Sequence, residues 1–354
     1  MARSLAVWLT GNSDEAPVEL HINYWALATS KLNYLDIGVK IKPNTKFESV
    51  NFYFPFSKKT THYDPSLGKT VCSGNGLLSA IFNSKVLSTD SDGGNSLLVK
   101  FPGEENLRFF QNIEPETKKS PEGVIISDSY DGKLPGMSLK FPSSLFKLST
   151  NSDESAYFRF RLILSDADKK SLSHIETPKG ELITGHLETT ELVDFRVNEQ
   201  RNIPVKIREN INTPSILNAV HLFLIREASA EYKLSHSSYK RCRVLESELW
   251  DKYLESEIKS SKNFKKSPQM LIYHWASKKD ANKSVEHFSA FSKFVERKTG
   301  WWIIMAIALV IIALGASGSF VASIAEKNIY TDDDKTDNTT SLLNIQKNRG
   351  YTNV

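Results

Sequence analysis

The sequence predicts a mainly β protein of the antiparallel β-sandwich type, with α-helices in the C-terminal third and one C-terminal transmembrane helix. Alternation of apolar and polar residues, which is typical of strands, dominates the first two-thirds of the chain. Helical periodicity is confined mainly to the last third. Residues 299–325 carry no charged side chain, although 24% of the 354 residues are charged.

The first expected strands are residues 18–24 and 35–41, where apolar residues alternate with polar or small ones. This pattern predicts strands with one buried face. Residues 50–56 place Phe at alternate positions, and Pro55 marks a sheet edge or a strand end. The turn-rich segment 92–95 separates two apolar segments and predicts a β-hairpin.

The later strands are expected at residues 156–164 and 192–198, which also alternate between apolar and polar positions. Residues 220–225 and 270–275 are apolar on both faces, apart from His274. Such segments are typical of central strands or of strands covered on both sides. Two packed sheets account best for these patterns.

Two helices are expected before the membrane. An apolar stripe through Leu245, Leu249 and Tyr253 predicts an amphipathic helix over residues 241–259 that can dock on a sheet. A second stripe predicts an amphipathic juxtamembrane helix over residues 281–299. The residues of that second stripe are Val285, Phe288, Phe291 and Val295.

The expected organisation has four regions. Residues 1–280 form a β-rich domain, and a loop-rich stretch near residues 120–150 leaves its subdivision open. The juxtamembrane helix follows, and residues 300–325 form the transmembrane helix. Residues 326–354 form a short acidic and polar tail.

Residues 299–325 are long enough to cross a bilayer, because at 1.5 Å per residue they span about 40 Å against about 30 Å of hydrocarbon. Trp301 and Trp302 begin the run, where aromatic rings favour the headgroup level. The alternative of a buried helix in a soluble protein fits less well, because such helices usually have a polar face. The residues expected to contact lipid are Trp301, Trp302, Ile303, Ile304, Leu309, Val310, Ile311, Ile312 and Leu314.

The charges that flank this run predict its orientation. Lys293, Arg297 and Lys298 precede it, whereas acidic residues dominate the segment 332–337. Basic residues are retained on the cytoplasmic side, so the N-terminal domain is expected in the cytoplasm and the tail outside. We expect a single-pass protein of a bacterial inner membrane. The two cysteines are far apart and indicate neither a disulfide framework nor a thiolate metal site.

Motifs of known enzymes are missing from the sequence. It contains no phosphate-binding glycine motif, no HExxH and no GxSxG, so no catalytic residue, metal ligand or cofactor is expected. His62 and Asp64 fit a surface turn better than a site, and His174, His186, His221 and His236 have no visible partner. The net charge of +4 gives no reason to expect a nucleic-acid partner.

Three arginines are the candidate ligand-binding residues. Arg159, Arg161 and Arg196 lie at alternate positions of two predicted strands. If these strands are neighbours, the guanidinium groups line one sheet face and can bind a phosphate or carboxylate. The alternative is that Asp194 and Glu199 neutralise them on a solvated face.

The predicted membrane helix carries a stripe of small residues. Gly315, Ser319 and Ser323 recur at every fourth position, a spacing that lets two helices approach closely. Self-association is therefore one expected interaction, although small residues are also frequent in spans that do not associate.

Three functions are compatible with these observations. The first, which we prefer, is a membrane-anchored cytosolic recognition or sensor module that binds a protein, a peptide or a small anionic ligand. The second is a membrane-perturbing effector of bacterial stress or phage defence that oligomerisation triggers. The third is a membrane-anchored hydrolase without a recognisable motif, which ranks last because no catalytic motif is present.

Overall fold

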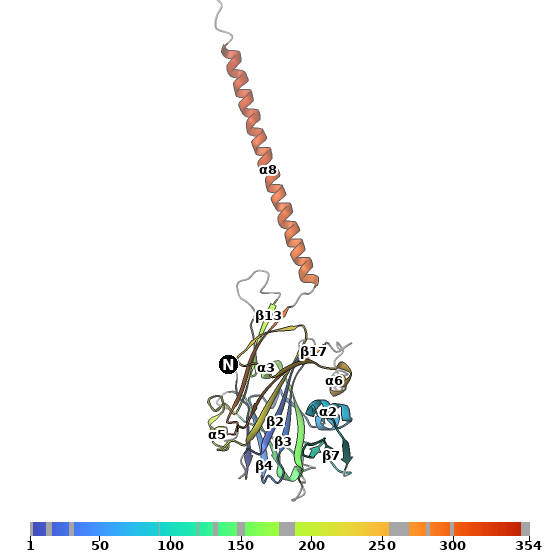
Figure 1. The fold of residues 1–354 in the computed structure, drawn as a ribbon. Helices are drawn as coiled ribbons and strands as arrows, with labels where there is room; N and C mark the ends of the chain where they lie inside the picture. Colours follow the sequence, from blue (N-terminus) through green and yellow to red (C-terminus); the bar gives the residue numbers. More distant parts are fainter. Residues whose placement is uncertain are drawn as a thin grey trace, which may run out of the picture. The chain divides into compact units, whose positions relative to one another are not determined.

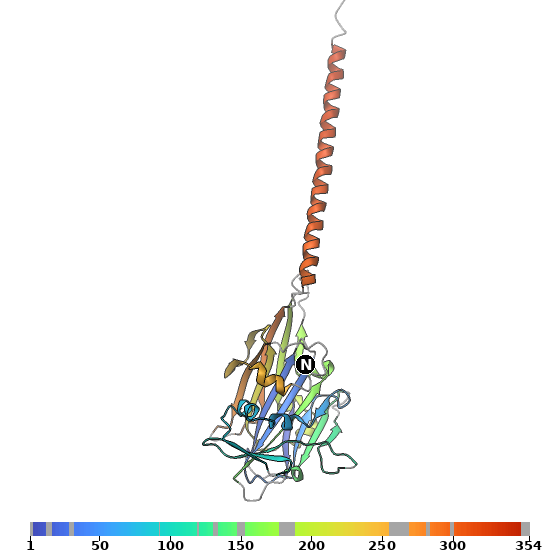
Figure 2. The ribbon, with the colours of Figure 1, turned by 90° about the vertical axis from the view of Figure 1, so that its right-hand side faces the viewer.

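The computed structural model (Figure 1, Figure 2) describes residues 3–11, 16–27, 32–91, 93–118, 120–129, 134–146, 153–176, 188–254, 269–280, 284–297 and 301–347. The chain divides into two compact units, Met1–Arg297 and Lys298–Val354. The described part of the first unit is mainly β, and it confirms the predicted fold class.

The largest sheet of the first unit has ten strands in the order β16-β17-β14-β2-β3-β11-β8-β7-β6, with β5 paired to β11. Most neighbours are antiparallel, whereas β14 and β2, and β11 and β8, run parallel. The strands are β2 (Val18–Leu27), β3 (Leu32–Ile41), β5 (His62–Asp64), β6 (Ser88–Ser91), β7 (Ser96–Lys100), β8 (Leu107–Phe110), β11 (Ser155–Leu164), β14 (Leu217–Glu227), β16 (Arg241–Val244) and β17 (Met270–Lys278).

Two four-stranded sheets complete the β structure. One has the order β1-β4-β10-β9, with strands β1 (Ala6–Thr10), β4 (Ser49–Phe54), β9 (Ile125–Asp128) and β10 (Met137–Pro142). The other has the order β12-β13-β18-β15, with strands β12 (Ser173–Glu176), β13 (Glu188–Val197), β15 (Ala230–Ser235) and β18 (Phe288–Arg297).

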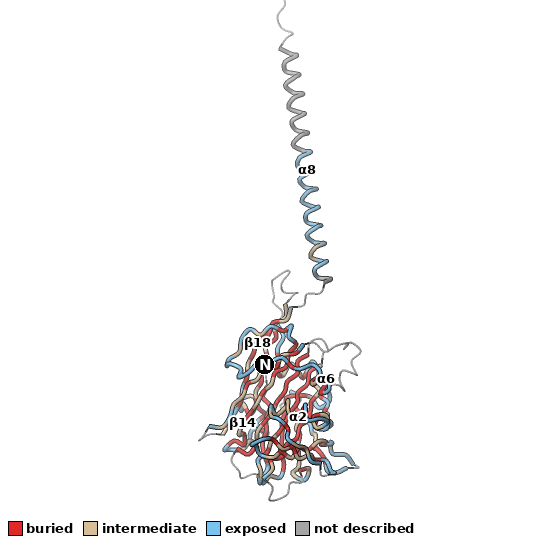
Figure 3. Tube along the Cα trace, turned by 45° about the vertical axis from the view of Figure 1, so that its right-hand side comes forward, coloured by how far each residue is buried: buried red, intermediate tan, exposed pale blue. Residues whose placement is uncertain are grey.

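The main apolar core joins all three sheets. Ile22 of β2, Phe52 of β4 and Phe195 of β13 are buried in one continuous cluster. The two small sheets therefore pack on one face of the large sheet, which is the sandwich arrangement that the sequence predicts. Figure 3 shows the buried strands at the centre of this unit.

Helices cover part of the opposite face of the large sheet. They are α1 (Leu67–Val71), α2 (Asn75–Phe82) and α6 (Ser247–Tyr253), and both ribbon views show α2 and α6 on one side of the strands (Figure 1, Figure 2). A second apolar cluster includes Trp25 and Tyr157 of the sheet and Trp250 of α6. The remaining short helices are η1 (Ser143–Leu145), α3 (Asp166–Lys169), η2 (Gln200–Asn202) and α5 (Val205–Arg208).

This helical layer corrects two expectations. Strands β2 and β3 are covered on both faces, so the interpretation of a single buried face is wrong. Asp36 of β3 is buried and accepts a hydrogen bond from Tyr253 of α6, whereas Glu19, His21 and Lys40 stay partly exposed. Helices α1 and α2 also lie in the first third of the chain, where only strands are expected, and each is at most eight residues long. The hairpin β6–β7 and the central position of β14 are as predicted.

The predicted juxtamembrane helix over residues 281–299 is also wrong. Residues 288–297 form strand β18, which pairs with β13 and β15. Phe288, Ala290, Ser292 and Phe294 are buried at every second position. The apolar residues fit both a helical and a strand period, and pairing with two strands decides in favour of the strand. Residues 281–283 and 298–299 lie outside the described residues.

The predicted helix over residues 241–259 is shorter than expected. Its first part is strand β16, which pairs with β17, and only Ser247–Tyr253 is helical in the described residues. Leu245 and Tyr253 are buried, so part of the apolar stripe does dock on the sheet. Residues 255–259 of the predicted helix lie outside the described residues.

The second unit contains one long helix, α8 (Trp301–Lys347). Its segment Ile304–Lys327 is long and apolar enough to cross a membrane, and none of its described side chains is buried in the protein (Figure 3). The helix continues into the segment that the sequence analysis treats as a polar tail. The Ser317 and Ser319 hydroxyls donate to the carbonyls of Ala313 and Gly315. These hydroxyls therefore have internal partners, as an apolar environment requires.

Candidate functional site

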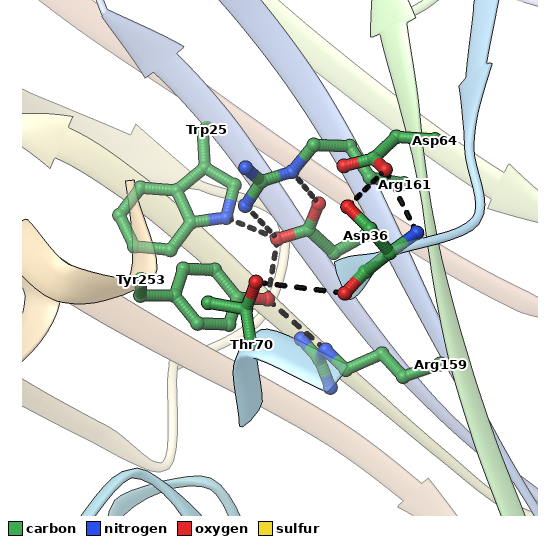
Figure 4. Close-up of polar contacts among 8 residues, drawn as sticks. Trp25, Asp36, Asp64, Thr70, Arg159, Arg161 and Tyr253 are labelled. Carbon is green, nitrogen blue, oxygen red and sulfur yellow. Dashed lines mark hydrogen bonds and ion pairs between the residues drawn. The ribbon is translucent and has the colours of Figure 1, made fainter. Parts of the chain in front are cut away.

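A buried carboxylate organises the helix-covered face of the large sheet (Figure 4). Asp36 of β3 is fully buried and accepts hydrogen bonds from Arg161 of β11, from Nε at 2.6 Å and from Nη2 at 3.0 Å. The Trp25 indole donates at 2.7 Å, and the Tyr253 hydroxyl of α6 donates at 2.6 Å. The Arg161 guanidinium also lies 4.7 Å from the centre of the Tyr34 ring. Arg161 therefore belongs to an internal ion pair beneath α6.

Arg159 lies two positions earlier on β11 and extends this network. Its Nε donates to the Tyr253 hydroxyl at 3.0 Å, and its Nη1 donates to the Tyr157 hydroxyl at 3.2 Å. Arg159 is only 2% exposed, and its Nη2 has no hydrogen-bond partner among the described residues. A buried charged donor without a partner is costly, because it has lost its hydration.

The Arg159 guanidinium nevertheless stays charged. Burial by itself lowers the pKa of Arg159, but nearby Tyr253, Tyr157 and Asp36 outweigh this effect and raise the pKa above its ordinary value. The group is therefore a fixed positive charge inside the protein.

Strand register places Arg159 in one row with two histidines. Arg159 lies opposite Gly38 of β3, Gly38 lies opposite His21 of β2, and His21 lies opposite His221 of β14. A Cβ atom on Gly38 would collide with the Tyr157 hydroxyl and would lie 3.1 Å from Arg159 Nη1. The glycine thus leaves the space that the tyrosine and arginine side chains occupy.

A cavity of about 460 Å³ opens beside this row. Strands β2, β14, β16 and β17 and the end of α2 contribute its lining. A smaller hollow of about 20 Å³ shares His21, Phe223 and Arg243 with the cavity and reaches Arg159 and Trp250. This hollow has room for about one water molecule or one ligand oxygen. Arg159 lines this hollow and not the cavity itself, and we call the hollow the inner end of the cavity because the two share lining residues.

Basic side chains dominate the charged lining. The cations are Lys40, Lys240, Arg241, Arg243 and Lys278, and the acidic residues are Glu19 and Glu104. Lys40 lies 3.6 Å from the Glu105 carboxylate. The other four cations form no ion pair with a carboxylate in the described part of the chain, and all four are exposed. A concave surface with this excess of positive charge attracts anions.

Three histidines and one glutamate meet at the wall of the cavity. The His21 Nε2 atom lies 2.9 Å from Glu19 Oε1, and His221 Nε2 lies 3.5 Å from the same oxygen. The second nitrogens also have neighbours, since His221 Nδ1 lies 3.0 Å from His274 Nε2 and His21 Nδ1 lies 3.4 Å from the Tyr157 hydroxyl. Hydrogen bonds thus connect the histidine cluster through Tyr157 and Arg159 to the buried carboxylate.

The charge states in this cluster follow from burial and from neighbouring charges. Burial, followed by the His21 charge, lowers the pKa of His221. Burial and the nearby Lys240 and Arg241 lower the pKa of His274 to about 4. Burial raises the pKa of Glu19, but the His21 hydrogen bond and the charges of the histidines outweigh burial and lower it. At neutral pH, His221 and His274 are therefore neutral and Glu19 is ionised.

The structure separates the three arginines that the sequence analysis groups together. Arg159 and Arg161 lie on β11 of the large sheet, whereas Arg196 lies on β13 of a small sheet. The two strands are not neighbours, so the predicted row of three guanidinium groups does not form. Asp194 accepts hydrogen bonds from Arg196 at 2.6 and 2.9 Å, so the alternative interpretation holds for Arg196 alone, and the pair lies within one strand. Arg159 lines the small hollow next to the cavity, whereas Arg161 and Arg196 are paired with carboxylates.

The structure also describes some of the other residues considered in the sequence. His62 and Asp64 lie on strand β5, which pairs with β11, so the predicted surface turn is wrong. His62 is exposed, and Asp64 accepts hydrogen bonds from the backbone N–H and the hydroxyl of Ser66. His186 and the side chains of residues 301–303 lie outside what the structure describes. A Cβ atom on Gly315 would meet no described atom within 4 Å, and helix association remains a prediction.

Sequence reasoning missed most of the cavity. It treats Glu19 and His21 as the polar face of a half-buried strand, gives His221 no partner, and names His274 only as the polar exception in an apolar strand. The local signal was the pair of titratable residues two positions apart on one strand, which places both on the same face. No protein-family model and no curated protein matches the chain.

Proposed function

We propose that the chain is a single-pass membrane protein whose N-terminal domain binds a small anionic ligand in the cavity between α2 and the large sheet. The observation that carries this proposal is the 2%-exposed Arg159, whose Nη2 atom has no hydrogen-bond partner in the described structure, at the inner end of a cavity with a basic rim. The cavity volume of about 460 Å³ falls in the range of small-molecule sites.

Two sets of charges support an anion as the ligand. At the rim, Lys240, Arg241, Arg243 and Lys278 have no carboxylate partner among the described residues. At the inner end, Arg159 can donate from Nη2 to a phosphate or carboxylate oxygen. Phe223 supplies an apolar wall between these charges. Ligands with one anionic group and an apolar or aromatic body therefore fit best.

The helix α8 supports the membrane part of the proposal, because its segment Ile304–Lys327 is long and apolar enough to cross a bilayer. Lys293, Arg297 and Lys298 before this segment favour a cytoplasmic N-terminal domain, here proposed for a bacterial inner membrane. The ligand would then be a cytoplasmic metabolite or the headgroup of an inner-leaflet lipid. Both present the same phosphate or carboxylate chemistry.

Native mass spectrometry of the full chain, extracted from its own membranes in mild detergent, tests the proposal. We expect the wild-type protein to retain an anion, and its mass distinguishes a lipid from a metabolite. Arg243→Ser should lose it, because this exposed side chain lines both the cavity and the hollow. Arg201→Ser is the matched control, since Arg201 is exposed on a different element. No bound anion, or equal retention by both variants, would contradict the proposal.

The membrane-anchored hydrolase is the second candidate function. The observation that favours it is the neutral His221 and the ionised Glu19 in the same cavity as the basic rim. An ionised carboxylate or a neutral imidazole within reach of a bound anion can accept a proton from an attacking water and so act as general base. Hydrolysis of an anionic ester by the wild-type chain, lost in Glu19→Gln, would establish this function.

A further inference from the structure

We propose that Glu19, His21 and His221 bind a divalent transition-metal ion of the zinc class. Their ligand atoms, one carboxylate oxygen and one nitrogen from each imidazole, all lie within 4.8 Å of one another. Zinc binds such atoms at about 2.0–2.2 Å, which places tetrahedral ligands about 3.4 Å apart. The 2.9 and 3.5 Å separations from Glu19 Oε1 to the two Nε2 atoms therefore require only small side-chain adjustments.

The sheet fixes the three ligands relative to one another. Glu19 and His21 are two positions apart on β2, so both side chains point to the same face. His221 lies opposite His21 on the adjacent parallel strand β14. All three ligands therefore come from paired strands inside the large sheet, and none comes from a loop. Sites on rigid elements hold their ligands more accurately than sites on loops.

The outer nitrogens of both histidines have hydrogen-bonding neighbours, as those of metal-bound histidines do, although here the neighbours are an imidazole and a hydroxyl. His221 Nδ1 lies 3.0 Å from His274, and His21 Nδ1 lies 3.4 Å from the Tyr157 hydroxyl. Such contacts orient the ring so that the other nitrogen, Nε2, faces the metal. In His221 this Nε2 atom is buried and has no hydrogen-bond partner in the described structure. A metal ion would supply the missing partner.

The donor set indicates the class of metal. Two imidazoles and one carboxylate suit zinc and similar transition metals, whereas Ca²⁺ and Mg²⁺ favour oxygen ligands. Three protein ligands leave a coordination position for water or a ligand atom, and all three residues line the cavity. The site is independent of the proposed anion function, because it requires none of the basic rim residues.

A second pair of a histidine and a glutamate in the same chain serves as a comparison for the proposed metal site. His174 and Glu176 on β12 repeat the pairing of a histidine and a glutamate two positions apart, at 3.9 Å. Their side chains are 71% and 59% exposed, and no third ligand group lies within reach among the described residues. A metal site is therefore expected at Glu19 and its neighbours and not at this pair.

The test uses the full chain, purified without a polyhistidine tag and stripped of metal, in detergent. Titration with zinc chloride alone should give one site, and Glu19→Gln and His221→Asn should each weaken it by more than about 100-fold. His274→Asn, which removes only the orienting contact, should weaken it by about tenfold. His174→Asn should leave the zinc affinity unchanged.

X-ray absorption of the zinc-loaded wild-type protein makes the test independent of how the variants fold. We expect nitrogen and oxygen ligands with two imidazoles and no sulfur. No wild-type binding at micromolar zinc, sulfur ligation through Cys72 or Cys242, or unchanged affinity in Glu19→Gln and His221→Asn would each overturn the proposal. Anion retention in the Arg243→Ser comparison is a separate readout, so the two proposals can fail independently.

Discussion

The Tyr253 hydroxyl donates a 2.6 Å hydrogen bond to the Asp36 carboxylate, joining helix α6 to strand β3 across 217 positions of sequence. The same hydroxyl accepts from Arg159 Nε at 3.0 Å. Tyr253 thus connects the buried ion pair of Asp36 and Arg161 to the arginine at the inner end of the cavity. The stability of the domain and the shape of its site depend on the same side chains.

Asp36→Asn should destabilise the N-terminal domain by about 3–5 kcal/mol, because it leaves the buried charge of Arg161 without its counter-ion. Guanidinium unfolding of the full chain in detergent, followed by tryptophan fluorescence, measures this. Asp194→Asn is the control, since its pair with Arg196 is more exposed and should contribute only about 0–1 kcal/mol. Equal effects of the two substitutions would disprove the central role of Asp36.

Gly38→Ala should weaken anion binding and destabilise the domain, because the new methyl group collides with the Tyr157 hydroxyl and displaces Arg159. Replacing Tyr157 by Phe removes the hydroxyl with which the new methyl group collides, and so tests whether this collision causes the loss of stability. The double variant Gly38→Ala/Tyr157→Phe should recover part of the lost stability, measured by the same unfolding experiment. A double variant that is less stable than Gly38→Ala alone would rule out this collision as the cause.

Glu191 should make the stability depend on pH. It lies on β13 with Lys169 at 3.1 Å and the Arg226 guanidinium as a second partner. Burial raises the pKa of Glu191, but Arg226 and Lys169 outweigh burial and lower it below its ordinary value of 4.5. The folded state therefore binds fewer protons than the unfolded state, so this contribution is present above pH 4.5 and is lost as the pH falls through the lower folded pKa.

We test this pH dependence by measuring the free energy of unfolding of the wild-type protein and of Glu191→Gln from neutral pH to below pH 4.5. The wild-type protein should be more stable at neutral pH, and its advantage should shrink as the pH falls below 4.5. An advantage that is constant or grows on acidification would contradict the assignment.

Membrane orientation can be read from a native cysteine. Cys242 is exposed on β16. If the N-terminal domain is cytoplasmic, a membrane-impermeant maleimide should leave Cys242 unlabelled in intact cells and label it after permeabilisation. Asn338→Cys, in a chain whose two native cysteines are replaced by Ser, should be labelled in intact cells without permeabilisation. Labelling of Cys242 in intact cells would contradict the proposed orientation.

The stripe of small residues predicts association of α8. Gly315→Ile should reduce self-association in a membrane-helix reporter assay, because the larger side chain prevents close approach. Gly318→Ile is a matched control, since Gly318 lies outside the stripe of Gly315, Ser319 and Ser323 and also has open space at its Cβ. Equal association of the two variants would argue against this interface.

Local patterns predicted most of the strands but few of the contacts between them. Alternation identified β2, β3 and β11, because their apolar faces pack on the core of the sandwich. The same reasoning failed for β18, where Phe288, Phe291 and Val295 satisfy a helical period as well. Only pairing with β13 and β15 distinguishes the two structures.

The residues of the candidate site could not be predicted either, because they come from different strands. Arg159, His21 and His221 come from three strands, and strand register alone places them in one row. Hydrophobic periodicity carries no information about which strands are neighbours. It also cannot show that α2 and α6 cover the polar face of β2 and convert it from a solvated surface into a cavity wall.

Calorimetric titration of the full chain with phenyl phosphate, which has one anionic group and an aromatic body, tests the proposed cavity most directly. We expect one saturable site, with affinity weakened by about tenfold or more in Arg159→Met and Arg243→Ser, because each loses a charged hydrogen-bond donor worth about 1.5–3 kcal/mol. Arg201→Ser should bind as the wild-type protein does. Absence of saturable binding, or equal affinity in all four proteins, would contradict the account.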